Sequence, residues 1–339
     1  MRLQVRRRQG LHPLALVQLR RRFLGLVNRA PSLPWEVDSG SLRYCREIID
    51  SACGLVELYP PIQTAAHLVV PAQTERFGSI ALKIGLRRLA QRRAGTREGA
   101  AIPPLSEIAA LRKLADHPEF SLPVLVCADD HSWFIRQWTS GEVLSEIEGF
   151  AWNKTTVVEL WKLFEKIFEI FHDAAEPWLI RDIKPSNVLY GSGKFSLFDF
   201  STTRPLSEVN SRNRRDRLGS RAGRSWGPEL LFQGKDPIGV NADYFSLATM
   251  LYQLLRRERG PVWQNETPGQ EQAVAAYAVE YEKVRKKFPK SLKEVGMSGT
   301  QIDFWVACMN PDQGQRPDQF LSLNGGRFGS LASLWGRRY

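Results

Sequence analysis

The chain is poor in cysteine and has no long hydrophobic run. Its four cysteines are Cys45, Cys53, Cys127 and Cys308. None belongs to a C-x-x-C pair or stands at the spacing of His/Cys metal ligands, which argues for reduced thiols in an intracellular protein and against a disulfide framework or structural zinc. The longest apolar stretch, around 244–255, is interrupted by polar residues and is too short to cross a bilayer. We therefore expect no membrane span there, and a buried helix instead.

Acidic residues are missing from the start of the chain. The first 35 residues contain eight Arg and no Lys, Asp or Glu. The formal net charge of the whole chain is +11, and these eight arginines supply most of it. The rest of the chain carries only about +3, so we expect no specific nucleic-acid binding. Residues 1–34 read either as a disordered basic leader or as an organelle transit peptide. The expected location is cytoplasmic or nuclear, or organellar if the leader is a transit peptide.

The pattern of apolar residues predicts two lobes. Alternating apolar and polar residues predict three strands within 54–84 and two more at 123–128 and 132–138, with a helix beginning at Ser106 between the two groups. After Gly141 the pattern becomes helical, and the segment 157–174 carries a wide apolar face that must be buried. The predicted fold class is α+β, with a small five-stranded antiparallel lobe followed by a mainly helical lobe.

The segment from Leu179 to Ser201 places three chemically useful residues in one short loop, Asp182, Lys184 and Asn187. An Asp-Phe pair, Asp199 and Phe200, follows after an apolar strand. Asp182 can accept a hydroxyl proton, Lys184 can neutralise a phosphoryl group in transfer, and Asn187 with Asp199 can hold metal ions that bridge a nucleotide's phosphates. Two acidic surface turns that flank a buried strand would not need this fixed spacing.

This arrangement resembles the H-R-D-x-x-x-x-N and D-F-G loops of eukaryotic-type protein kinases, with Ile180 in place of His and Ser201 in place of Gly. The resemblance implies a bilobal kinase-like domain over 55–330, with an N-lobe of 55–138 and a C-lobe of 139–330. An extension, 35–54, precedes this domain, and a tail, 331–339, follows it. The implied cofactors are ATP and Mg²⁺ or Mn²⁺, and the implied partner is a protein substrate; the oligomeric state is left open.

The resemblance also names nucleotide-binding residues in the N-lobe. Ala81-Leu82-Lys83 is similar to the family's V-A-I-K strand, which makes Glu107 on the following helix the expected ion-pair partner of Lys83. Counting back from Gly141-Glu142 places Ile135 at the gatekeeper and 136–138 in the hinge. We then expect Ala81 and Ile135 to line an apolar adenine slot. The backbones of Arg136 and Trp138 would bond adenine, and Glu142 would reach the ribose.

Three features of the C-lobe resemble protein kinases more than small-molecule kinases of the aminoglycoside or choline type. Gly227-Pro228-Glu229 is similar to the A-P-E that closes an activation segment, and Arg316 stands where the family has the arginine that pairs with this glutamate. Asp243 is similar to the aspartate that opens a buried helix and bonds the catalytic-loop backbone. We expect Glu229 and Arg316 to form a buried ion pair.

Two regions depart from the family pattern. Residues 63–66, where a glycine-rich loop is expected, contain no glycine, so the backbone would hold phosphates less closely. In the activation segment, arginines from Arg204 to Arg224 alternate with serines. These arginines would either bind a phosphoserine of the segment or select an acidic substrate, or they belong to a solvated loop in which their charges have no specific role. Lys184 indicates the serine/threonine class. The alternatives are a pseudokinase scaffold with weak or no turnover, and a small-molecule kinase.

Overall fold

The chain divides into two compact units, one of residues 1–103 with 125–138 and the other of residues 104–124 with 139–339. The computed structural model describes 39–63, 67–85, 105–115, 117, 124–128, 132–138, 141–210, 229, 237–257 and 270–322. The basic leader 1–34, the tail 331–339 and most arginines of the activation segment lie outside these ranges. The predicted boundaries between lobes, extension and tail stay predictions.

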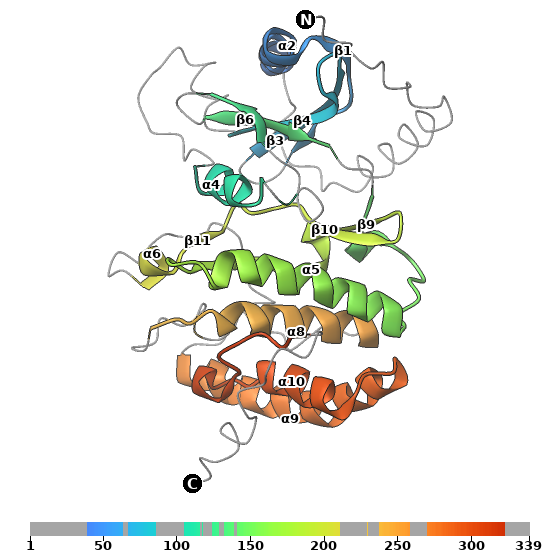
Figure 1. The fold of residues 1–339 in the computed structure, drawn as a ribbon, viewed down its shortest axis with the longest axis vertical. Coiled ribbons are helices and arrows are strands. Elements are labelled where there is room, and N and C mark those ends of the chain that lie inside the picture. Colours follow the sequence, from blue (N-terminus) through green and yellow to red (C-terminus); the bar gives the residue numbers. More distant parts are fainter. Residues whose placement is uncertain are drawn as a thin grey trace, which may run out of the picture. The chain divides into compact units, whose positions relative to one another are not determined.

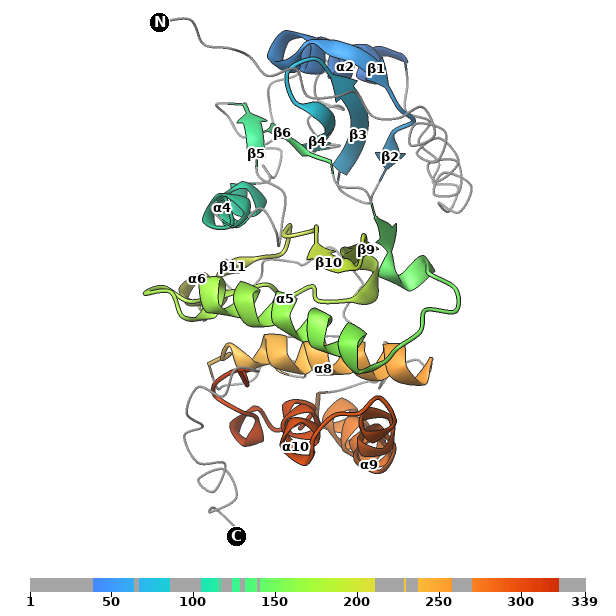
Figure 2. The ribbon, with the colours of Figure 1, turned by 45° about the vertical axis from the view of Figure 1, so that its right-hand side comes forward.

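The first unit is built on one antiparallel sheet (Figures 1 and 2). Its strands are β1 (Leu55–Leu58), β2 (Ile62–Gln63), β3 (His67–Thr74), β4 (Gly78–Gly85), β5 (Val124–Cys127) and β6 (Trp133–Gln137). The strand order is β1-β3-β4-β6-β5, and β2 also pairs with β3. Because Leu58 pairs with Ala72 and Ile62 with Val69, β1 and β2 run along the same edge of β3 as one bent strand. The sheet therefore has the five predicted strands, the first of them interrupted.

A helix that the sequence analysis did not anticipate covers one face of this sheet. Helix α2 (Ser39–Cys53) buries Cys45, Ile48, Ile49 and Cys53, which recur at the three- and four-residue steps of a helix face. These side chains share a core with the alternate residues of the central strands, Leu68, Val70, Ala72, Ile80, Leu82 and Ile84. Successive side chains of a strand point to opposite faces, so the residues between them, Ala81 and Lys83, lie on the other face.

The second unit is mainly helical. Its elements are α4 (Leu105–Lys113), β7 (Glu142–Val143), α5 (Lys154–His172), β8 (Trp178–Leu179), β9 (Val188–Gly191), β10 (Lys194–Leu197), β11 (Arg204–Pro205), α6 (Leu206–Asn210), α8 (Asn241–Arg256), α9 (Gln270–Glu294) and α10 (Gly299–Cys308). Helix α5 lies along α8, and α9 and α10 pack on the far side of α8 (Figures 1 and 2). The predicted helices of this lobe are confirmed. None of the helices in the described ranges is long and apolar enough to cross a membrane.

Local sequence explains where the two central helices begin and what they bury. Helix α5 starts at a capping box, in which the Asn153 side chain accepts from the Thr156 N–H at 3.1 Å and the Thr156 hydroxyl accepts from the Asn153 N–H at 2.9 Å. Helix α8 is buried on all sides over its first three turns, as expected for a helix in the centre of a lobe. Its first turn carries Asp243, so this side chain is fixed deep in the unit.

A short hairpin joins the two halves of the catalytic motif. Strands β9 and β10 are connected by Ser192 and Gly193, both with positive φ (53° and 77°), which is the backbone of a type I′ turn. Strand β9 begins directly after Asn187, and β10 ends two residues before Asp199. The tight turn therefore returns the chain so that Asp199 comes back toward Asn187.

Candidate active site

Two predicted catalytic residues and one predicted metal ligand meet at the Asp182 carboxylate. The Lys184 Nζ lies 2.7 Å from Oδ2 of Asp182. The side-chain nitrogen of Asn187 donates to the same Oδ2 and to the backbone oxygen of Asp182, each at 2.9 Å. Asp182 and Asn187 are buried, at 6% and 5% exposure. The loop thus holds an aspartate in a fixed orientation between a cation and an amide.

The hairpin brings the second carboxylate to this loop. The N–H of Phe198, the residue before Asp199, donates to the backbone oxygen of Asn187 at 3.1 Å. Because Asn187 uses its amide nitrogen on Asp182, its amide oxygen is the atom left to bind a ligand. An amide oxygen and a carboxylate are the hard donors that Mg²⁺ takes together with phosphate oxygens, so the donor set fits a metal-bound nucleotide. The described ranges contain no group of three or more His, Cys, Asp or Glu side chains that could hold a metal ion.

Asp243 of α8 anchors the backbone of the loop that carries Asp182. Its carboxylate accepts from the backbone N–H groups of Ile180 at 2.7 Å and Arg181 at 2.9 Å, which confirms the predicted contact with the catalytic-loop backbone. His172, the last residue of α5, lies with its Nε2 3.0 Å from the same carboxylate. The sequence analysis missed His172, whose only signal was a polar residue at the end of an apolar helix face.

The two substitutions in the family motifs are accommodated differently. Ile180 is fully buried, and its backbone oxygen accepts from the Thr202 hydroxyl at 2.9 Å, so an apolar side chain fills the place of the usual histidine as expected. The N–H of Ser201 donates to Oδ1 of Asp199 at 3.1 Å. Phe200 between them is buried against Phe171. Neither substitution removes a predicted metal ligand.

The predicted ion pair at the end of the activation segment is confirmed. Nη1 and Nη2 of Arg316 donate to the two carboxylate oxygens of Glu229 at 2.6 and 3.0 Å. Arg316 has no exposed surface; its Nε donates to the Asn310 oxygen at 2.7 Å, and its guanidinium lies 4.6 Å from the centre of the Phe245 ring. The arginine is therefore held on both edges and on one face.

In the first unit, the structure does not place Ile135 with Ala81. Cross-strand partners share a face of the sheet, and the pairs of β4 with β6 are Ala81 with Arg136, Leu82 with Ile135, and Lys83 with Phe134. Ile135 is part of the core under α2. The side chain on the Ala81 face is instead that of Arg136, which is 7% exposed.

The predicted hydrogen-bonding groups of the hinge backbone are shifted by one residue as well. The Trp138 N–H donates to the Ser79 oxygen at 2.9 Å, so it is used within the sheet, and the N–H of Arg136, two residues earlier, points the same way. The backbone groups directed away from β4 are those of Gln137. The physical reason is the two-residue period of a strand, in which a shift of one position moves every side chain and N–H to the other side.

The other residues predicted to bind the nucleotide lie in both units. Lys83 is 6% exposed in the first unit and Glu107 is fully buried in the second, so their pairing stays a prediction. Glu142 lies exposed in β7, opposite Tyr190 of β9. Of the glycine-free segment, Gln63 ends β2, and 64–66 lie outside the described residues.

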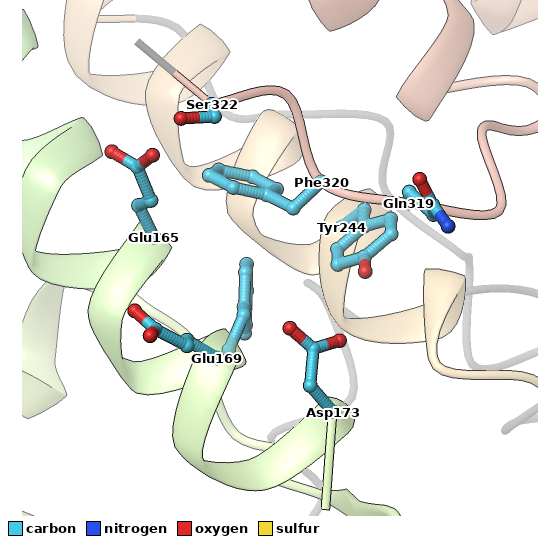
Figure 3. A pocket seen from close by; sticks show the side chains of 8 residues that line it. Glu165, Glu169, Asp173, Tyr244, Gln319, Phe320 and Ser322 are labelled. Carbon is cyan, nitrogen blue, oxygen red and sulfur yellow. The ribbon is translucent and has the colours of Figure 1, made fainter. Parts of the chain in front are cut away.

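A separate acidic pocket of about 460 Å³ lies between α5, α8 and the segment 319–322 (Figure 3). Glu165 and Glu169 of α5 and Asp173, the residue after its end, line it at four-residue steps, with Tyr244 and Phe320 opposite (Figure 3). Burial, together with nearby groups that include the Asp173 and Asp243 carboxylates, raises the pKa of Tyr244 far above its usual range. The described lining contains none of the predicted catalytic residues.

Comparison with known proteins identifies the family and the fold of the chain. The sequence matches the protein kinase domain family over residues 86–323. The chain belongs to that family. The match begins just after Lys83, so it omits the glycine-free segment 63–66. The solved structure of the kinase PK-1 of Cydia pomonella granulovirus is similar at 14% identity, with a TM-score of 0.56 over 84% of this chain and 96% of that one. That likeness shows the fold and confirms the predicted bilobal α+β kinase fold, while no curated protein matches this sequence.

Proposed function

We propose that this kinase transfers the γ-phosphoryl group of Mg-ATP to serine or threonine hydroxyls of a protein substrate. The observation that carries the proposal is the Asp182 carboxylate held by Lys184 and Asn187 at 2.7–2.9 Å. A carboxylate in this position can orient a hydroxyl and accept its proton as the oxygen attacks phosphorus. Serine/threonine specificity rests on Lys184, which stands in the loop as it does in that class.

The other site residues have supporting roles. Lys184 places a positive charge beside the phosphoryl group in transfer, where charge is most valuable in a site of low dielectric. Asn187 and Asp199 would hold Mg²⁺ or Mn²⁺, which supplies charge neutralisation for the phosphates when bound. Lys83, paired with Glu107, would hold the α- and β-phosphates, Ala81 would pack on the adenine, and Glu142 would bond the ribose.

A second candidate function is a pseudokinase scaffold that binds protein partners with little or no turnover. The glycine-free segment 63–66 and Ser201 after Asp199 favour it. The complete set Asp182, Lys184, Asn187 and Asp199 favours the enzyme, because a scaffold has no need of a charged loop built to this geometry.

Phosphate incorporation from labelled ATP tests the proposal. The full chain should phosphorylate itself or a general protein substrate only with a divalent metal, and Asp199→Asn should abolish this. Asp182→Asn should lower kcat by about 10²–10⁴-fold while ATP affinity stays within a few-fold, because a general base acts on transfer and not on nucleotide binding. Asp303→Asn, at an exposed position of α10, is the matched control and should keep full activity. Wild-type protein with no metal-dependent incorporation would favour the scaffold.

A further inference from the structure

The exposed face of helix α9 carries a row of lysines. Helix α9 packs on α10 and α8 and forms an outer edge of the second unit (Figures 1 and 2). Its buried residues recur at the three- and four-residue steps of a helix face and are Tyr281, Val284, Phe288 and Leu292. The opposite face is exposed and consists of lysines at the same steps, Lys283, Lys286, Lys287, Lys290 and Lys293. We call these five residues the lysine row.

The charge around the lysine row is unbalanced. Residues 282–294 contain six lysines or arginines and only two glutamates. One of the glutamates, Glu282, lies 3.0 Å from Arg285, which is not part of the row. Like charges four residues apart on a helix, such as Lys286 and Lys290, repel each other and destabilise the helix. The row therefore works against the stability of α9 and in favour of contact with a polyanion.

Two ordinary explanations of surface lysines do not account for the row. Lysines stabilise the carbonyl end of a helix only within its last turn, and the basic residue of that turn in α9 is Lys293 alone. Lysines that merely keep a surface hydrated are commonly interspersed with acids. Helix α5 has that pattern, and its exposed lysines pair with acids one turn away, Lys162 with Glu159 and Lys166 with Glu169.

The chemistry of the row favours an anionic lipid surface among the polyanions. All of its cations are lysines, which act as point charges, whereas base edges and phosphopeptides are read by bidentate arginines. Single-stranded nucleic acid stacks on exposed aromatic rings, but Tyr281 and Phe288 are buried. Val279, in line with the row four residues before Lys283, is 60% exposed. A bilayer interface accepts an apolar side chain beside its charged headgroups, whereas nucleic-acid phosphates offer it no contact.

We propose that the lysine row and Val279 dock the protein on a membrane surface that contains anionic lipids. The five lysines lie along one outer helix, so they approach a flat surface together, and each ammonium group lies near the lipid headgroups. The inference is independent of the proposed function, because no residue of the row belongs to the predicted nucleotide site. A scaffold without turnover would dock in the same way.

Co-sedimentation of the full chain with lipid vesicles tests the inference. The wild type should bind vesicles with about one-third phosphatidylserine and should not bind vesicles of phosphatidylcholine alone. The triple variant Lys286→Gln, Lys290→Gln, Lys293→Gln should bind roughly 100-fold more weakly, because each lysine near an anionic surface contributes about fivefold. Lys283 and Lys287 are left unchanged, since they also interact with other groups of the protein.

The matched control removes the same charge from another exposed helix face. Lys154→Gln, Lys162→Gln and Lys166→Gln of α5 should together leave vesicle binding within about twofold of the wild type, because charges beyond a Debye length of about 8 Å from the lipid are screened. Thermal unfolding checks that both triple variants are folded. If the α9 variant is not, Lys290→Gln alone should still weaken vesicle binding about fivefold.

Three outcomes would contradict the inference. The first is an α9 variant, triple or single, that binds anionic vesicles as well as the α5 control does. The second is a wild type that binds neither kind of vesicle, or both equally. The third involves duplex DNA as a second probe: Val279→Ser should weaken vesicle binding about threefold and leave DNA binding unchanged. If this variant changes neither while the α9 triple variant loses both, the row is a general polyanion surface, and its assignment to a membrane is wrong.

Discussion

Arg316 and Glu229 are 87 residues apart in the sequence, yet they form a two-point ion pair in which the arginine has no exposed surface. Glu229 belongs to the end of the activation segment, and Arg316 follows the last long helix. The pair therefore ties the residue that closes the predicted activation segment to the chain that follows α10.

Removing one partner of this pair should destabilise the protein strongly. Arg316→Ala leaves a mostly buried Glu229 without its counter-charge, which costs about 3–5 kcal/mol in the free energy of unfolding. Urea denaturation measures this change in the free energy of unfolding. The control is Arg285→Ala, which breaks the exposed pair of Arg285 with Glu282 and should cost about 0–1 kcal/mol. An Arg316→Ala protein as stable as the control would contradict the role given to the pair.

Asp243 should matter for both stability and activity. Asp243→Asn keeps the shape but replaces one of two acceptor oxygens by a donor NH₂ group, which then faces the N–H groups of the catalytic loop or His172. We expect a loss of about 1–3 kcal/mol in unfolding free energy and a fall in kcat, although Asp243 is no part of the predicted reacting set. Denaturation and kinetics on the same preparation check this, with Asp303→Asn as control. Unchanged kcat would show that the loop keeps its shape without this support.

Helix α2 should be required by the first unit, whereas the basic leader should not. Deleting residues 1–34 leaves α2 intact, and the thermal transition should be unchanged. Deleting 1–54 removes four buried apolar side chains, among them Ile48 and Ile49, which are worth about 1.5–3 kcal/mol each, and should unfold the sheet. Calorimetric scans of both truncations test the difference. Two identical scans would mean that the sheet does not depend on α2.

The free energy of unfolding should decrease at alkaline pH because the thiol of Cys45 is buried. Burial raises the pKa of Cys45 to about 12 from an ordinary value of 9.0. The folded state therefore holds the thiol proton more tightly than the unfolded state does. Below pH 9 the thiol is protonated in both states and the free energy of unfolding keeps its full value. As pH rises from 9 toward 12 that free energy falls, by up to about 1.4 kcal/mol per pH unit. Urea unfolding at pH 8.5 and 10.5 should show a smaller decrease for Cys45→Ala than for the wild type. Equal decreases would exclude Cys45 as the cause.

Sequence patterns predicted the parts of the fold that depend on local periodicity. The apolar face of α5 and the buried stretch of α8 follow directly from residue spacing, and the motif around Asp182 predicted a cluster that the structure brings together. Helix α2 carried a usable signal as well, since Cys45, Ile48, Ile49 and Cys53 recur at helical steps. It was missed because the kinase-like motifs begin at the strand after it.

The hinge could not be predicted in the same way. The sequence gives its position only by counting back from Gly141, and a residue count does not fix which face of a strand a residue occupies. Only the pairing of Ala81 with Arg136 does so. His172 illustrates a related limit, because its contact with Asp243 joins residues 71 positions apart. No local pattern connects them.

The bonds from Ile180 and Arg181 to Asp243 also have a consequence for hydrogen exchange. Asp243 is fully buried in a helix packed on all sides, so these two amide protons can meet solvent only when α8 separates from the loop. Their exchange should follow the slowest cooperative opening of the unit, while the exposed turn at Ser192 and Gly193 lacks such protection. The loop that carries Asp182 is irregular in conformation, yet its attachment to α8 should make it open only together with the core.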